Sequence, residues 1–175
     1  VKEILARVMM KLHGPKLQPE TVRQLLDEAS EALDRDPRQH DPHVHRAQQL
    51  LDLAEAQREV EGAMDIIVDA AKYSPALARA HQLLAEVRNE LDASTRGQGS
   101  RAEINRELEE AARRIERAGI ASDDIARSAQ LVRRAQAVLK RHDDELLAAR
   151  QRDLDKVEAL INSLKELPAV PNASL

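Results

Sequence analysis

Apolar residues recur at every third or fourth position along most of the chain, and capping residues next to proline or glycine separate the apolar runs. This spacing places apolar side chains on one face of an α-helix, whereas a half-buried strand would alternate apolar and polar residues. Asp41-Pro42 and Ser74-Pro75 each place a capping side chain before a proline at the first helical position. They therefore predict helices that begin at residues 42 and 75.

Similar signals predict the remaining helices. Ser100 and Glu103 form a capping box, and Gly119 is expected to end the helix that this box begins. The stripe that follows Ser122 is long enough for one helix to about residue 166, or for two helices broken near His142. Helices are also expected over residues 1–12, 19–35, 42–57, 63–70 and 75–92, with a turn near Arg58 to Gly62 between the third and the fourth.

The composition agrees with an all-α fold. Hydrophobic residues make up 42% of the 175 residues, but aromatic residues only 1%, so the core must consist of aliphatic side chains. Charged residues make up 33% and there are only five glycines, which favours helix at nearly every position. We predict stacked antiparallel helical hairpins, in a repeat-like right-handed stack, followed by a long helical hairpin or coiled coil.

Several functional classes are disfavoured by what the sequence contains. The chain has no cysteine, which excludes disulfides and thiolate chemistry and indicates a reducing, cytoplasmic compartment. A formal charge of -4 and a single tyrosine give no basis for binding nucleic acid. No apolar run is long enough to cross a bilayer, so we expect a soluble protein with no membrane span.

The flexible segment Ser94 to Gly99 divides the chain. We expect a repeat-like subdomain over residues 1–93, a linker over 94–100, a hairpin or coiled-coil subdomain over 101–166, and a tail over 167–175. The hairpin region holds 14 basic and 14 acidic side chains, a balance typical of a thin, solvated hairpin. The start at Val1 and the proline-containing tail predict that the chain is part of a larger protein.

The segments that begin at Pro42 and Pro75 are alike. They share six of ten residues at an offset of 33, close to the period of known helical repeats. Residues 20–92 resemble degenerate tetratricopeptide repeats, because small, large, small and proline positions follow the helix-B spacing of that family. The matching residues are Ala63, Ile67, Ala70 and Pro75.

This resemblance implies a protein or peptide partner bound along the inner helical face. It would place six residues on that face: Arg46, Gln49, Arg79, Gln82, Glu86 and Asn89. The Lys and Asn with which family members hold a terminal carboxylate are missing at the matching positions, and so are the favoured aromatic residues. Residues 101–166 have a weaker similarity to the helical lid of ATP-dependent heat-shock chaperones, based only on helical periodicity.

No group of residues indicates catalysis. The serines have no base nearby in the sequence, and adjacent acids such as Asp123 and Asp124 do not converge on one point of a helix. His40, His43 and His45 could supply metal ligands, but we expect a solvated loop and helix start instead. We therefore predict a non-catalytic interaction or scaffolding module without a cofactor; the alternative is self-association as a homodimer through the C-terminal hairpin.

Overall fold

The structure is a computed structural model that describes residues 19–39 and 41–167. These residues form six α-helices and one 3-10 turn, with no strand among them. The helix expected over 1–12, His40 and the tail from 168 onward lie outside the described residues. The elements are α2 (Pro19–Asp34), α3 (Pro42–Ile67), η1 (Ala70–Lys72), α4 (Pro75–Thr95), α5 (Arg101–Glu116), α6 (Asp123–Lys140) and α7 (Asp143–Glu166).

The helix starts follow the capping chemistry. The Asp41 carboxylate accepts a hydrogen bond of 2.8 Å from the His43 N–H, at the first turn of α3. Ser74 accepts from the Leu77 N–H at the start of α4, and Ser100 accepts from Glu103 at the start of α5, each at 3.3 Å. All three predicted starts are confirmed, and Gly119 follows α5 with a left-handed φ of 69°.

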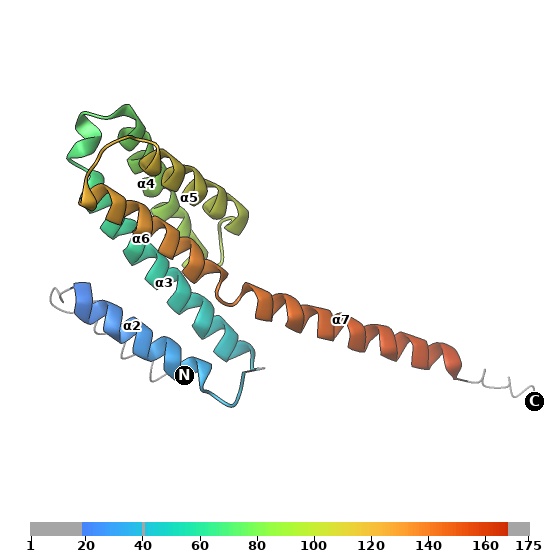
Figure 1. Cartoon of the computed structure of the whole chain (residues 1–175). Coiled ribbons are helices and arrows are strands. Elements are labelled where there is room, and N and C mark those ends of the chain that lie inside the picture. Colours follow the sequence, from blue (N-terminus) through green and yellow to red (C-terminus); the bar gives the residue numbers. More distant parts are fainter. Residues whose placement is uncertain (1–18, 40, 168–175) are drawn as a thin grey trace, which may run out of the picture. The chain divides into compact units, whose positions relative to one another are not determined.

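The first compact unit contains a closed bundle of four helices, α3 to α6 (Figure 1). Each consecutive pair packs together, and α6 returns to pack against α3. The hydrophobic core of the bundle consists of aliphatic side chains and Met64, as the composition predicts. Because the first and fourth helices touch, these helices surround one shared core.

Helix α2 packs against the N-terminal half of α3, outside the bundle core (Figure 1). A small separate cluster joins the two helices. Its members are Val22, Leu26, Ala29, Leu33, Ala47 and Leu51.

The predicted turn near Arg58 to Gly62 is wrong, because α3 runs unbroken for 26 residues. Gly62 lies inside this helix, where a Cβ atom would come within 3.3 Å of the Leu131 Cδ1 on α6. The glycine therefore serves close packing between two helices rather than a change of chain direction. Val60 and Ala63, on either side of it, are fully buried.

The stripe after Ser122 is divided between two helices, since Arg141 and His142 separate α6 from α7. The chain also divides here into two compact units, residues 1–141 and 142–175. Segment 94–100, expected to be a linker between subdomains, instead joins α4 and α5, which pack against each other within the first unit. Helix α7 is the described part of the second unit.

Candidate functional site

A row of carboxylates lies on one buried face of α3. Asp52, Glu55 and Glu59 are three and four residues apart, so they follow one side of the helix, and each is less than 5% exposed. Acidic side chains are almost never this buried unless they are paired. They form the centre of what we call the charged clasp.

Three arginines from two other helices meet this row and complete the charged clasp. Arg23 of α2 donates to Glu59 at 3.0 Å, and Arg141, just after α6, donates to Glu55 at 3.2 Å. Arg134 of α6 lies 3.7 Å from Glu55 and 3.4 Å from Glu59. The clasp thus joins α2, α3 and α6 through ion pairs.

Glu55 is the carboxylate of the clasp whose pKa is raised. Burial raises its pKa, and the charges of Arg141 and Arg134 only partly oppose this effect. Its Oε1 atom has no hydrogen-bond partner, although Arg134 lies within ion-pair distance. This carboxylate is therefore held in place by charge more than by hydrogen bonds.

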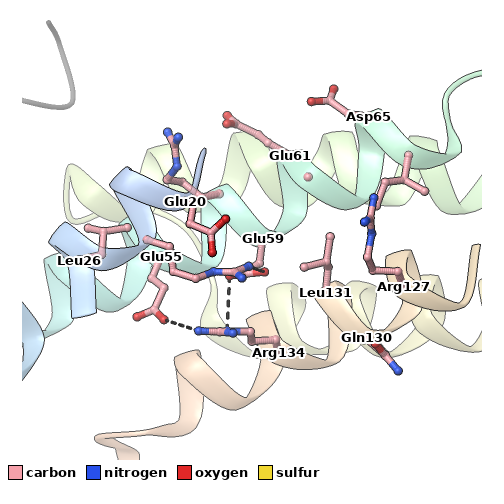
Figure 2. A pocket seen from close by; sticks show the side chains of 14 residues that line it. Glu20, Leu26, Glu55, Glu59, Glu61, Asp65, Arg127, Gln130, Leu131 and Arg134 are labelled. Carbon is pink, nitrogen blue, oxygen red and sulfur yellow. Dashed lines mark hydrogen bonds and ion pairs between the residues drawn. The ribbon is translucent and has the colours of Figure 1, made fainter. Parts of the chain in front are cut away.

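A cleft with a volume of about 660 Å³ opens beside the clasp, between α2, α3 and α6. Figure 2 shows Glu55 and Glu59 directed toward Arg134, with Leu131 and Leu26 on the walls. The lining also includes Glu20, Glu61, Asp65, Arg58 and Arg127, so both signs of charge are mixed. The cleft presents no single charge that would select an ionic ligand.

The cleft is lined by few kinds of side chain that could take part in catalysis. Its described lining includes no serine, threonine, lysine, histidine or tyrosine. Carboxylates are therefore the only side chains among these residues that could act as nucleophiles. Both buried carboxylates face guanidinium groups. The arrangement is that of an ion-paired junction between helices.

The residues expected on a binding face are spread along α3 and α4. Arg46 donates to the Thr95 carbonyl at 3.1 Å, which places it beside the end of α4. Arg79 lies near the start of α4, 16 residues before Thr95, or about 24 Å along the helix axis. Gln49, Gln82, Glu86 and Asn89 lie between these ends. Arg46 and Arg79 are therefore at opposite ends of the antiparallel pair, and Arg79 donates to its own neighbour Gln82.

The structure describes two of the three clustered histidines. His43 is exposed and His45 half-buried in the first turn of α3, while His40 lies outside the described residues. No group of three or more potential metal-binding side chains occurs within residues 19–39 and 41–167.

A second acidic cluster lies between α4 and α5. Glu107 is 7% exposed and its Oε2 atom has no hydrogen-bond partner. Its pKa is raised first by burial and then by the charges of Glu86, Glu103 and Glu90, which Arg106 partly offsets. The cluster is an electrostatic cost to the bundle, since like charges gather around a buried carboxylate.

Helix α7 carries the main exposed apolar surface among the described residues. Five large aliphatic side chains on it are between 48% and 67% exposed: Leu154, Val157, Leu160, Ile161 and Leu164. Among residues 19–39 and 41–141 of the first unit, large apolar side chains are exposed only singly, at Val68, Tyr73 and Ile120. We call the five residues on α7 the apolar face; the sequence predicted their stripe, but as part of a hairpin seam.

Comparisons with known proteins give no relative for this chain. No protein-family model matches it, and neither a curated protein nor a solved structure is significantly similar. Within the described part of the chain, every helix is too short or too polar to span a membrane. Function must therefore be inferred from the side chains themselves.

Proposed function

We propose that this chain is a non-catalytic protein–protein interaction module that binds helical partners through α7. The apolar face of that helix carries the proposal. Leu154, Val157, Ile161 and Leu164 follow one another at intervals of three, four and three residues, and Leu160 lies beside them. This is the pattern by which one amphipathic helix docks against another.

The cost of exposing this face supports the proposal. Burying a leucine or isoleucine side chain is worth about 1.5–3 kcal/mol, so five such side chains in water represent a large unused free energy. Most of the stability of a helix in a protein comes from the packing of its amphipathic face. A partner that covers the face would stabilise both the contact and the helix.

The absence of enzymatic activity is part of the proposal. The cleft beside the clasp is lined by ion-paired carboxylates and arginines, with no histidine or hydroxyl group among its lining residues. The bundle α3 to α6, with α2 attached, would then act as a folded body that carries the docking helix. A cytoplasmic location, expected from the lack of cysteine, fits such a role.

We also propose that the segments beginning at Pro42 and Pro75 originate from tetratricopeptide repeats. Both segments that it aligns begin at a capped proline, and Ala47 and Ala80 are buried at matching places, as are Leu51 and Leu84. A duplicated helix followed by fusion of one hairpin into the continuous α3 would account for the offset of 33. A groove on α3 and α4 is not needed for the function proposed.

Site-specific photo-crosslinking in the native cell tests the function. A photoreactive phenylalanine analogue would replace Leu160 in the apolar face, and, as the matched control, Asp155 on the polar side of α7. We expect one predominant covalent adduct from position 160 and none from position 155. Equal adducts from both positions, or none from position 160, would refute binding through this face.

A further inference from the structure

The apolar face of α7 is asymmetric about its centre. At 100° per residue, its five side chains span an arc of about 120°. Leu154, Val157, Ile161 and Leu164 form the centre, and Leu160 extends the arc on one flank. The other flank is polar, with Glu158 and Lys165.

This asymmetry decides how two such helices would pair. In a parallel pair, opposite flanks meet, so Leu160 would face Lys165 of the second helix and Asp153 would face Glu158. In an antiparallel pair, like flanks meet. Leu160 then meets Leu160, and the polar flanks remain together at the water-exposed edge.

The register follows from the need to cover all five side chains. When the two-fold axis lies near Ala159, Leu154 faces Leu164 of the second copy and Val157 faces Ile161. A shift of the axis toward Asn162 would pair Glu158 with Lys165, but it would leave Leu154 without a counterpart. Exposed ion pairs contribute little, so apolar burial favours the axis near Ala159, even though the two Glu158 side chains then approach each other.

The area and charge also suit a second copy. At their observed exposure the five side chains offer about 100 Å² each, so two helices would remove about 1,000 Å² from water. This reaches the size from which specific interfaces begin, before the stems of flanking residues are added. Residues 151–166 hold three basic and four acidic side chains, so two copies carry almost no net repulsion.

We infer that α7 forms an antiparallel pair with α7 of a second copy of this chain, with its two-fold axis near Ala159. The inference rests on the proposed function and names its partner. The face is self-complementary, as an isologous interface requires, because each apolar residue meets another across the axis.

Sedimentation velocity of the full chain tests the pairing. The wild type is expected to be a dimer at about 50 µM. Leu160→Lys places two ammonium groups against each other at the axis and should weaken the dimer at least about 100-fold. The control is Ala159→Lys, because Ala159 lies at the level of the axis but on the exposed, polar side of α7. It should change the dissociation constant of the dimer less than about threefold. A monomeric wild type, or a Leu160→Lys variant that still dimerises normally, overturns the inference.

Spin labels test the orientation, and the cysteine-free chain allows single labels without other changes. Arg152→Cys, Ala159→Cys and Glu166→Cys place the labels seven residues apart on the polar side. In an antiparallel pair, the two labels at position 152 lie about 20 Å apart along the helix axis, and so do the two labels at position 166. The two labels at position 159 lie at the same level. Equal distances at the three positions would indicate a parallel pair and would overturn the inference.

The two proposals fail in different ways. A monomer in sedimentation, together with a crosslink from position 160 to another polypeptide, refutes the second copy and leaves the interaction function intact. A monomer with no such crosslink refutes both. A monomer whose position 160 crosslinks to its own residues 1–141 means that α7 folds back on the bundle, which also overturns both.

Discussion

Two glutamates on α5, only two residues apart, meet opposite surroundings. Glu107 is buried toward Glu86, Glu90 and Glu103, and burial followed by these charges raises its pKa. Glu109 accepts a hydrogen bond of 2.9 Å from Gln136 and further bonds from Arg133 and Arg113, which lower its pKa to about 2. The same side chain therefore opposes folding at one position and supports it at the other.

Glu107→Gln should stabilise the protein at pH 7 by about 1 kcal/mol. A raised pKa means that the folded state binds the proton more tightly, so the glutamate costs stability above its ordinary pKa of 4.5 and costs nothing well below it. Urea denaturation at pH 7 and at pH 3 measures the difference between variant and wild type. A variant that is less stable than the wild type at pH 7 would contradict the assignment.

Glu109→Gln should have the opposite effect and destabilise the protein at pH 7, by less than about 1 kcal/mol because solvent screens this partly exposed carboxylate. The lowered pKa means that Glu109 contributes stability above 4.5, and that this contribution is lost as the pH falls toward about 2. Denaturation curves across this range should converge for variant and wild type. Glu110→Gln is the matched control, because Glu110 pairs only with Arg114 on its own helix and should change stability by less than about 0.5 kcal/mol.

At the scale of the element, the charged clasp adds ion pairs to the apolar packing that joins α2, α3 and α6. Arg134 lies within 3.7 Å of both Glu55 and Glu59, and Arg141 also donates to the Ser30 hydroxyl of α2 at 3.0 Å. Buried carboxylates are costly when they lose a cation, while exposed pairs are nearly neutral. The clasp should therefore be sensitive to the loss of one arginine.

Arg134→Gln should destabilise the bundle by about 1–2 kcal/mol, since each carboxylate keeps one other arginine. Arg127→Gln on the same helix is the control, because Arg127 is exposed and lies 3.9 Å from Asp124. Its effect should stay below about 0.5 kcal/mol. Thermal unfolding of both variants measures the contrast; equal melting temperatures would show that the clasp does not support the fold.

The helix boundaries show which structural features could be predicted from the sequence and which could not. Helix starts at Pro42, Pro75 and Arg101 were predictable, because a capping side chain acts on neighbouring backbone groups. The continuity of α3 was not, since Gly62 is as compatible with a turn as with a close helix contact. That contact depends on Leu131, which is 69 residues away and invisible to any local pattern.

The same limit applies to the candidate sites. Charged residues on a helix are usually solvated, so no local pattern indicates that Asp52, Glu55 and Glu59 are buried. Their burial requires three helices to pack together. The stripe on α7 was visible in the spacing of Leu154, Val157, Ile161 and Leu164. What no periodicity could show is that no other part of the second unit covers these side chains among the described residues.

At the scale of the whole molecule, the division after Arg141 predicts two separable properties. A chain of residues 1–141 should unfold cooperatively, because the closed ring of α3 to α6 keeps its entire aliphatic core. It should also sediment as a monomer, since the apolar face is removed. Circular dichroism and sedimentation of this fragment check both expectations; a fragment that dimerises like the full chain would place the interface on the bundle.

Pairing of α7 with a second copy would cover its apolar face in the assembled protein. Hydrogen–deuterium exchange of the full chain tests this most directly, compared with the Leu160→Lys variant at the same concentration. If the pair forms, the α7 amides from residues 151 to 166 should exchange slowly in the wild type and fast in the variant, with equal rates in α3 to α6. Wild-type α7 amides that exchange as fast as those of the variant, at a concentration of about 50 µM, would contradict it.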